Sequence, residues 1–401
     1  MDEHNHMKKV VLLRAPCLVS SGYGVHSRQI AKWLLSHDDE IDLYIQTLPW
    51  GSCSWIVDIK KSADIEKIFQ KCKPLPEGVK PDVSIQVQLP NEWDPTIAKY
   101  NIGVTAAVET NKCNPAWIIN CNSMDCIVVP SAFTKDVLEK TGIILKPIHV
   151  IPESYPEVFD DESPAQSKEV QEFLDSIDTS YNFIVFGQIT GNMEDIDRKG
   201  ILQTIRLLCE EFKKDSDVSI IVKTNQGKST TIDKYHTENY IKKIVDANRV
   251  GPYPKVRLLH GDLTDSEIFQ LLSSPKVKAN VCITKGEGFG LTLLESARAG
   301  LPVVATDWSA HTEFLNLGKW VDLTSSLVDI PKQKVDNQIF VKGSKWAKVD
   351  DGHAKKRLRK IRESHSIPKE WAQELSTKIK ERYCWGSIKK YMDDLLLSAL
   401  K

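Results

Sequence analysis

Short β-rich apolar runs alternate with amphipathic stretches along most of the chain. In its first part we interpret these runs as buried strands: Lys9–Leu13, Ile41–Ile45, Val83–Val87, Ile102–Ala106, Ile127–Val129 and Ile148–Ile151. Helical patterns lie between several of them, for example at Val25–Leu35 and at Ser131–Glu139, where Ser131 is a suitable N-cap. Such alternation predicts an α/β fold with a parallel sheet that helices cover on both faces.

The segment from Pro152 to Ser180 interrupts this pattern. It is rich in Glu, Asp, Ser and Pro, and we interpret it as a linker with one short helix near Glu169–Leu174. The alternation then restarts, with predicted strands at Phe183–Phe186, Val218–Val222, Val256–Leu259, Ala279–Ile283 and Pro302–Ala305. The helices predicted between them are Gly200–Phe212, Ile232–Ala247, Ser266–Leu272 and Gly290–Ala299. Beyond Leu323 the pattern predicts helices without further strands, notably Lys355–Arg362, Lys369–Arg382 and Ser387–Leu397.

Two doubly wound, Rossmann-like domains follow from this pattern. The first spans 1–155 and is completed by a C-terminal helix at about 385–401, and the second spans 156–384. A length of 401 residues agrees with two hydrophobic cores. Open α/β sheets bind ligands outside the carboxyl ends of their strands, so we expect the ligand in a cleft between the domains.

Composition excludes several classes of protein. The formal net charge of −1 gives no overall field that would attract nucleic acid or an anionic membrane. The polar N-terminus, MDEHNHMKKV, lacks the features of a secretory signal, and no stretch approaches the ~20 apolar residues of a membrane span. The nine cysteines show neither zinc-site nor CxxC spacing. We therefore expect reduced thiols and a cytoplasmic protein.

The strongest functional signal is the run KGEGFGLTLLESARAGLPVVATDWSA at 285–310. A strand precedes it, and its glycines would let a ligand approach the backbone: Gly286, Gly288 and Gly290. The free N–H groups of Gly290, Leu291 and Thr292 at a helix start predict a diphosphate site. Glu287 and Glu295, separated by seven residues, could accept hydrogen bonds from two parts of one ligand. The competing interpretation is a glycine-rich turn with two solvated glutamates.

This run resembles the donor-site signature of the retaining glycosyltransferases of family four, which have the GT-B fold. The resemblance implies that Glu287 contacts the transferred sugar and that Glu295 binds the ribose of the donor nucleotide. It further implies that Phe289 and Gly290 complete the turn. The backbone amides of Leu291 and Thr292 would then bind the diphosphate.

A second segment, FGQITGNMEDIDRKG at 186–200, resembles the loop of this family that ends in Arg-Lys-Gly. Lys199 matches the lysine that neutralises the donor diphosphate, and Arg198 precedes it. Gln188 stands where many members have an arginine, so Arg198 is a candidate substitute. An exposed helix start is the alternative for Arg198 and Lys199. The D-x-D at 195–197 is interpreted as loop acidity, and we predict no essential metal.

The first domain carries looser matches. In SSGYGVHSR, residues Gly22, Tyr23 and Gly24 resemble the glycine loop that faces the donor diphosphate and the acceptor, although a simple turn would look the same. Glu109 lies near a position where many relatives have a histidine. It is a candidate catalytic base or hydroxyl-orienting acid, and the alternative is a strand-end acid bonded to nearby backbone.

Three further features concern the acceptor side and the C-terminal part of the chain. Asn91 and Trp93 in PNEWD are candidate acceptor-side residues, with an exposed Trp93 as a stacking platform for a sugar and a packed Trp93 as the alternative. The final helix resembles the one that returns to the first domain, with Trp385 as its anchor. The basic run Lys355–Arg362 follows Lys342, Lys345 and Lys348, and it reads as a solvated helix face or as a surface for DNA or anionic lipid.

The resemblance implies retaining transfer of a hexose or pentose from a UDP- or GDP-linked donor, with Glu287 as a catalytic residue and no other cofactor. Glu109 is the second candidate for a catalytic residue. A glycan or lipid-linked glycan is the expected acceptor, with peripheral membrane contact possible. The alternatives are transfer to hydroxymethylated pyrimidines in viral DNA, a nucleotide-sugar epimerase, and a nucleotide-sugar binding protein without catalysis. The base, the sugar and the oligomeric state are not set by these residues.

Overall fold

The structure is a computed structural model of the chain, and it describes residues 8–56, 58, 62–224 and 230–400. Residues 1–7 of the polar N-terminus and residue 401 of the predicted final helix lie outside the described residues. Two compact units form. The first comprises the chain up to Ala107, Cys113–Ser154 and the chain from Gly386, and the second comprises Val108–Lys112 and Tyr155–Trp385. The segment Val108–Lys112, which we had placed in the first domain, belongs to the second unit.

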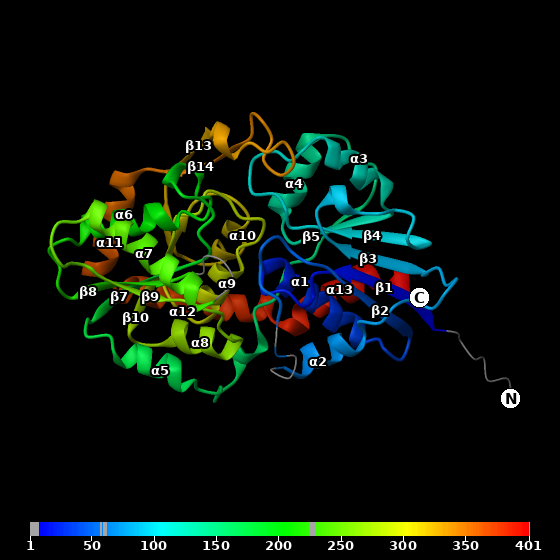
Figure 1. Cartoon of the computed structure of the whole chain (residues 1–401), viewed down its shortest axis with the longest axis horizontal. Helices are drawn as coiled ribbons and strands as arrows, with labels where there is room; N and C mark the ends of the chain where they lie inside the picture. Colours follow the sequence, from blue (N-terminus) through cyan, green and yellow to red (C-terminus); the bar gives the residue numbers. More distant parts are fainter. Residues whose placement is uncertain (1–7, 57, 59–61, 225–229, 401) are drawn as a thin grey trace. The chain divides into compact units, whose positions relative to one another are not determined.

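The first unit is built on a parallel sheet with the strand order β2-β1-β3-β4-β5-β6. Its strands are β1 Lys9–Ala15, β2 Ile41–Thr47, β3 Val83–Val87, β4 Tyr100–Val104, β5 Cys126–Val129 and β6 Ile148–Val150. Its helices are α1 Gly22–Leu35, α2 Ala63–Gln70, α3 Ala116–Ser123, α4 Ala132–Thr141 and α13 Trp385–Leu400. Helices α1, α2 and α13 cover one face of the sheet, and α3 and α4 the other (Figure 1). The side chain of Ser131 caps α4 as predicted, accepting from the Thr134 N–H.

The second unit repeats this design with the strand order β12-β11-β10-β7-β8-β9. Its parallel strands are β7 Tyr181–Phe186, β8 Val218–Lys223, β9 Lys255–Leu259, β10 Val277–Cys282, β11 Val303–Thr306 and β12 Val321–Leu323. One apolar core lies under α6 Ile201–Glu211, α7 Thr231–Asn248 and α11 Asp351–Glu363. The other lies under α5 Lys168–Asp175, α8 Asp265–Ser273, α9 Leu291–Arg298, α10 His311–Leu315 and α12 Ser366–Tyr383. The buried strands read as near-continuous apolar runs because helices cover both faces.

The strand order of the second sheet reverses between two neighbours, β7 and β10. From β7 the chain runs outward through β8 and β9, and from β10 it runs outward in the opposite direction. The loops that follow β7 and β10 therefore lie side by side at the carboxyl edge. This topological switch point is where open α/β sheets bind ligands.

Two predictions for the second half of the chain need correction. The segment 152–180 is not a loose linker, because Tyr155 and Phe159 are buried in the second core and Val170 and Leu174 anchor α5 there. The prediction that strands stop at Leu323 is wrong. Strands β13 Ser325–Asp329 and β14 Lys345–Val349 pair as an antiparallel hairpin. In β14 the exposed Lys345 and Lys348 are separated by two buried residues, so the strand shows no period-2 alternation that the sequence could reveal.

Two further expectations from the sequence concern the cysteines and membrane-spanning helices. All nine cysteines are present as thiols, and six of them are buried. No helix within the described residues is long and apolar enough to cross a membrane.

Candidate active site

The loops after β7 and β10 come into direct backbone contact. Gly200, at the end of the first loop, has φ +65, and a Cβ placed there would lie 1.9 Å from the Ile283 carbonyl oxygen. The Lys285 N–H donates to the Arg198 carbonyl at 2.7 Å. A residue with a side chain at 200 would separate the loops, so this glycine allows the candidate site to form.

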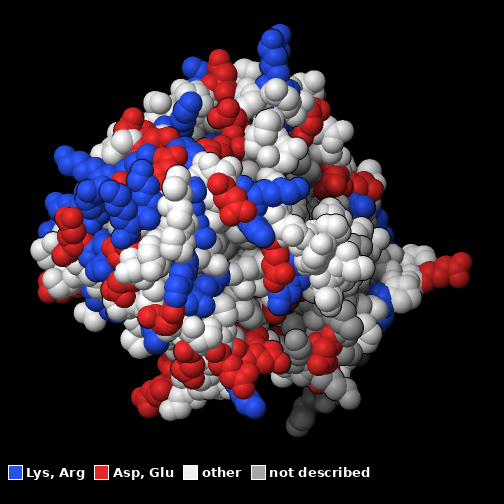
Figure 2. Space-filling view, turned by 60° about the vertical axis from the view of Figure 1, so that its left-hand side comes forward, with Lys and Arg blue, Asp and Glu red and all other residues white. Residues whose placement is uncertain are grey.

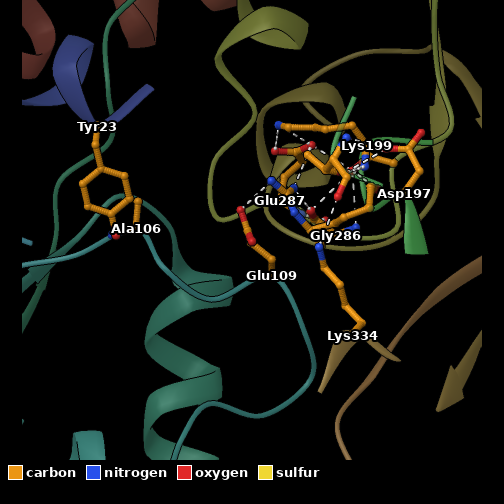
Figure 3. Close-up of polar contacts among 12 residues, drawn as sticks. Tyr23, Ala106, Glu109, Asp197, Lys199, Gly286, Glu287 and Lys334 are labelled. Carbon is orange, nitrogen blue, oxygen red and sulfur yellow. Dashed lines mark hydrogen bonds and ion pairs between the residues drawn. The ribbon is translucent and has the colours of Figure 1, made fainter. Parts of the chain in front are cut away.

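Glu287 is the centre of the resulting cluster (Figure 3). Its carboxylate is 6% exposed and accepts from Lys199 Nζ at 2.6 and 2.8 Å and from Thr284 Oγ1 at 2.8 Å. Arg198 Nη1 lies 3.5 Å from the same carboxylate. Burial alone would raise the pKa of Glu287, but Lys199 and Arg198 outweigh it and hold the pKa at about 2. Glu287 is therefore an ionised hydrogen-bond acceptor at neutral pH.

A chain of hydrogen bonds fixes the backbone of Glu287. His311 Nε2 lies 2.7 Å from the Thr306 carbonyl oxygen, which can only accept, so Nε2 carries the proton. His311 Nδ1 then accepts from the Ser309 hydroxyl at 3.2 Å, and Ser309 Oγ accepts from the Glu287 N–H at 2.9 Å. Burial lowers the pKa of His311, in keeping with a neutral ring. Ser309 has φ +89, a conformation that non-glycine residues adopt where the surroundings enforce it.

Glu109 reaches the same cluster from the segment Val108–Lys112. Its Oε1 lies 2.8 Å from Arg198 Nη2, while Arg198 Nη1 donates to the Gly286 carbonyl at 2.7 Å. A Cβ at Gly286 would lie 2.1 Å from the Glu109 carbonyl oxygen, so the two backbones touch. Burial raises the pKa of Glu109, although Arg198 opposes the shift. Glu109 and Glu287 thus differ in basicity while sharing one arginine.

Helix α9 begins directly after this turn. Gly290 is its N-cap with φ +103, and no side chain caps the helix. The N–H groups of Leu291 and Thr292 stand at the positive end of the helix dipole, as predicted for an anion site. Glu295, one turn further along, is 7% exposed, and no group among the described residues hydrogen-bonds its carboxylate. Burial raises the pKa of Glu295 to about 8.

Three residues that we predict to bind the donor differ in exposure. The Phe289 side chain does not face a ligand: it is buried in the core beside Phe314 and Tyr383, so only its backbone belongs to the turn. Gln188 is exposed in the loop after β7. Gly288 is buried within the turn.

The glycine motif of the first unit lies inside a helix. Gly22, Tyr23 and Gly24 form the first turn of α1, where we had predicted a loop, and Ser21 caps this turn by accepting from the Gly24 N–H. The Tyr23 hydroxyl lies 3.0 Å from Thr105 Oγ1 and accepts from the Ala106 N–H at 3.0 Å (Figure 3). Tyr23 thereby joins α1 to the end of β4.

The two acceptor-side candidates of the first unit differ in exposure, because Trp93 is buried and Asn91 is exposed. Trp93 is not an exposed stacking platform: it is 5% exposed, and its ring carbons lie 2.8 Å from where a Cβ of Gly103 would be. The absence of a side chain at Gly103 makes room for the indole, so the packed alternative holds. Asn91 is exposed in a short 3-10 turn, η2 Pro90–Glu92. Trp385 is partly buried at the start of α13.

The D-x-D motif and the basic run are both engaged within the second unit. Asp197 is fully buried and accepts from Thr190 N and Oγ1 and from Leu202 N, which is a structural role. Across the described residues, no cluster of three or more His, Cys, Asp or Glu side chains could hold a metal ion. Four of the six Lys and Arg residues of α11 form ion pairs: Lys355 with Glu210, Arg357 with Asp322, Arg359 with Glu211, and Arg362 with Asp215 and Asp217. Figure 2 shows acidic side chains among the basic ones on the face it presents.

Sequence reasoning missed four residues of the cluster: Thr284, Ser309, His311 and Lys334. Three of them lie in or beside the glycine-rich run, and their polar side chains next to an apolar strand were a usable signal. Lys334 comes from the loop between β13 and β14 and had no such signal, because that hairpin was itself not predicted.

Comparison with known proteins agrees with this geometry at the level of the fold. No protein-family model and no curated protein matches the chain. A glycosyltransferase from Rickettsia africae matches with a TM-score of 0.64 and 14% identity over 98% of this chain and 99% of that one. HepE from Anabaena, solved with UDP and glucose, matches with a TM-score of 0.63 and 14% identity over 97% and 100%.

The chain has a GT-B fold. This confirms the fold predicted from the sequence. Sucrose-phosphate synthase from Thermosynechococcus elongatus shares the GT-B fold with a TM-score of 0.63 and 12% identity over 98% of this chain and 99% of that one. At such identities, the reaction has to be argued from the residues of this chain.

Proposed function

We propose that this GT-B protein is a retaining glycosyltransferase that moves a sugar from a nucleoside diphosphate sugar to a hydroxyl of a glycan or lipid-linked glycan. The observation that carries the proposal is Glu295, a buried carboxyl group with no hydrogen-bond partner among the described residues, one turn beyond an uncapped helix start. Leaving such a group unpaired is costly unless a ligand satisfies it. A ribose, with two adjacent hydroxyls, is suited to a carboxylate.

The leaving group would be stabilised by positive charge at the start of α9. A diphosphate placed there accepts from the N–H groups of Leu291 and Thr292 and lies at the positive end of the helix. Lys199 reaches this region from the neighbouring loop and holds Glu287 by two hydrogen bonds. Its ammonium has further donor capacity for a phosphate oxygen, because a lysine offers three N–H donors.

The two acids of the cluster would divide the work on the sugar. With a pKa of about 2, Glu287 is a weak base, so we assign it to accepting a sugar hydroxyl and to stabilising positive charge at the reacting carbon. Glu109, whose pKa is raised, is the better proton acceptor, and we assign it to orienting or deprotonating a hydroxyl. Attack by the acceptor on the face that the diphosphate leaves gives retention.

The base of the donor is proposed from a neighbour. HepE was solved with UDP and glucose, which favours a UDP-sugar as the first donor to test. The decisive experiment is calorimetric titration with UDP-, GDP- and ADP-sugars, followed by a donor-turnover assay with the nucleotide that binds.

Two variants test the donor residues. Lys199→Met should raise the donor dissociation constant by roughly 10- to 100-fold, the range for loss of a charge-assisted hydrogen bond. Glu295→Gln should raise it by roughly 3- to 10-fold, the range for loss of one uncharged hydrogen bond, because the carboxyl group of Glu295 is mostly protonated near pH 7. Lys332→Met, an exposed lysine on the loop between β13 and β14, serves as a charge-matched control and should leave binding unchanged. Unaltered binding in both site variants would contradict the donor site. Binding without turnover for every donor would instead indicate a nucleotide-sugar binding protein.

A further inference from the structure

The cations closest to Glu287 are already neutralised. Lys199 pairs with Glu287, and Arg198 lies between Glu287 and Glu109. Two positive and two negative side chains sum to zero, so these four groups provide no net charge for a diphosphate. A buried diphosphate requires additional positive charge beyond a helix start.

Lys334 lies beside this cluster, and the part of the chain that the structure describes gives it no acidic partner. Its Nζ donates to the Thr190 carbonyl at 3.2 Å and stands 5.3 Å from the centre of the Phe340 ring. Within the residues that the structure describes, no carboxylate lies at ion-pair distance from it. The nearby Asp336 is occupied, because its Oδ1 accepts from the backbone N–H groups of Gln338, Ile339 and Phe340.

The loop that carries Lys334 is held firmly against the site. Lys334 ends a short 3-10 turn, η5 Lys332–Lys334, between β13 and β14. The loop packs on an apolar cluster whose buried members are Ile330, Phe340 and Trp346. The Ala347 N–H of the same hairpin donates to the Lys285 carbonyl at 2.9 Å, next to Gly286 and Glu287. The hairpin is therefore joined to the glycine-rich turn itself.

The surroundings of Lys334 favour an added anion. Figure 3 shows its side chain pointing from the hairpin toward the group formed by Glu109, Gly286 and Glu287. Burial lowers the pKa of Lys334, and the neighbouring Arg198 lowers it further, while Glu109 opposes this. A phosphate between Lys334 and Arg198 would remove the repulsion between the two cations.

We infer that Lys334, on the loop between β13 and β14, is a donor-binding residue. Its ammonium group would bind the diphosphate of a nucleoside diphosphate sugar. This inference rests on the proposed function. The ammonium also contacts the carbonyl of Thr190, two residues after Gln188, so Lys334 brings positive charge to the loop that follows β7. Among the described residues around Glu287, Lys334 is thus a cation whose charge no carboxylate neutralises.

The test compares nucleoside diphosphate with nucleoside binding in the full chain. UDP, GDP and ADP are titrated calorimetrically, and the base that binds is used with Lys334→Met, Lys334→Arg and Lys332→Met. We expect Lys334→Met to weaken the diphosphate by about 10- to 100-fold and the corresponding nucleoside by less than about threefold. Lys334→Arg should restore most of the affinity, and Lys332→Met should match the wild type.

The outcomes separate this inference from the function on which it rests. If the wild type binds a nucleoside diphosphate and Lys334→Met binds it equally well, the role of Lys334 is overturned while the donor site stands. Equal losses for nucleoside and nucleoside diphosphate would also overturn it, since they would report a general disturbance of the site. If no nucleoside diphosphate binds to the wild type, the proposed function fails together with the inference.

Discussion

Glu287 and Glu295 show how strongly local surroundings change one residue type. Both are less than a tenth exposed and lie within one turn and the helix that follows it. Two cations and Thr284 surround Glu287 and keep its pKa at about 2, whereas Glu295 has no such partner and its pKa rises to about 8. The folded chain therefore stabilises the ionised form of Glu287. It destabilises the ionised form of Glu295, and hydrogen bonds from a ligand would offset that destabilisation.

The first prediction concerns this cost. The Glu295 carboxyl ionises near pH 4.5 in the unfolded chain and near pH 8 in the folded one, so the wild type loses stability as the pH rises between these values. Glu295→Gln removes the titration. We expect its free energy of unfolding to exceed that of the wild type by an amount that grows from pH 4.5 to 8 and then levels off, at up to roughly 4 kcal/mol.

Urea unfolding at pH 5, 7 and 9 measures this difference. The control is Glu172→Gln in α5, the same substitution at an exposed glutamate. A constant difference for Glu295→Gln across the three pH values would contradict the buried, unpaired state of this carboxylate.

At the scale of elements, α1 shows that a motif can be structural. Gly22 and Gly24 both lie in its first turn, but a Cβ at Gly24 would lie 1.9 Å from the Val19 carbonyl oxygen, while at Gly22 nothing lies within 4 Å. Only the second glycine is required by packing. The other is available for a ligand, because it is exposed.

Paired alanine variants test this distinction. We expect Gly24→Ala to lower the free energy of unfolding by about 2–3 kcal/mol, because the helix start has to move away from Val19. Gly22→Ala should change it by less than about 0.5 kcal/mol or raise it slightly, since alanine favours a helix. Thermal unfolding followed by circular dichroism measures both. Similar losses in the two variants would contradict the close approach at Gly24.

The hairpin β13–β14 also fixes the position of the segment Val108–Lys112, which carries Glu109. Asn111 and Lys345 exchange two hydrogen bonds: the Asn111 N–H donates to the Lys345 carbonyl at 2.9 Å, and the Lys345 N–H donates to Asn111 Oδ1 at 2.6 Å. Together with the contact at Gly286, these bonds place Glu109 next to Arg198. The segment is therefore attached to the edge of the hairpin through β14.

Loosening this contact should affect transfer more than donor binding. Asn111→Ala removes the acceptor for the Lys345 N–H, so we expect kcat to fall by about tenfold with an unchanged donor dissociation constant, since a small displacement of Glu109 disturbs the chemical step. Asn111→Asp keeps an acceptor oxygen and should restore most of the rate. Steady-state kinetics with the donor identified above, alongside calorimetry, measures both quantities. Parallel losses in binding would assign Asn111 to the donor site instead.

At the scale of the molecule, the chain returns to its first unit at its end. Asp393 of α13 accepts from Nε1 of Trp33, which lies on α1, at 2.9 Å, and it lies 3.0 Å from Nε2 of His37, in the turn after α1. Burial would raise the pKa of Asp393, but Lys389, Trp33 and His37 outweigh it and lower the pKa. A folded-state pKa below the usual 3.8 means that this contribution to stability is present above that value and is lost as the pH falls below it.

Replacing Asp393 tests the C-terminal closure of the first unit. We expect Asp393→Ala to lower the free energy of unfolding by about 1–3 kcal/mol at pH 7, because the buried Trp33 N–H loses its acceptor. Amide hydrogen exchange should then increase in α1 and α13 while β7 and β10 stay protected. Asp394→Ala, the adjacent acid, is the control. Faster exchange in β7 and β10 to the same degree would show that the effect is not confined to the first unit.

Much of the fold could be predicted because its strands and helices follow from the apolar and polar pattern of neighbouring residues. Each predicted strand up to Ala305 overlaps an observed strand within a few residues, and the short helix near 169–174 forms as α5. The misses have a common origin. The role of 108–112, the packing of Trp93 against Gly103 and the hairpin β13–β14 all depend on residues distant in the chain, whose contacts leave no periodic signal.

The sequence by itself determined the α/β architecture, the glycine-rich turn before α9 and the pair Glu287 and Glu295, because apolar period and helix-start chemistry act over a few neighbouring residues. Only the tertiary structure decided how charge is distributed in the site. It buried Glu295 without a partner, divided Arg198 between two acids and brought Lys334 to the cluster from a hairpin. Burial and charge pairing depend on what the folded chain places within a few ångströms, and sequence spacing carries no record of such distances.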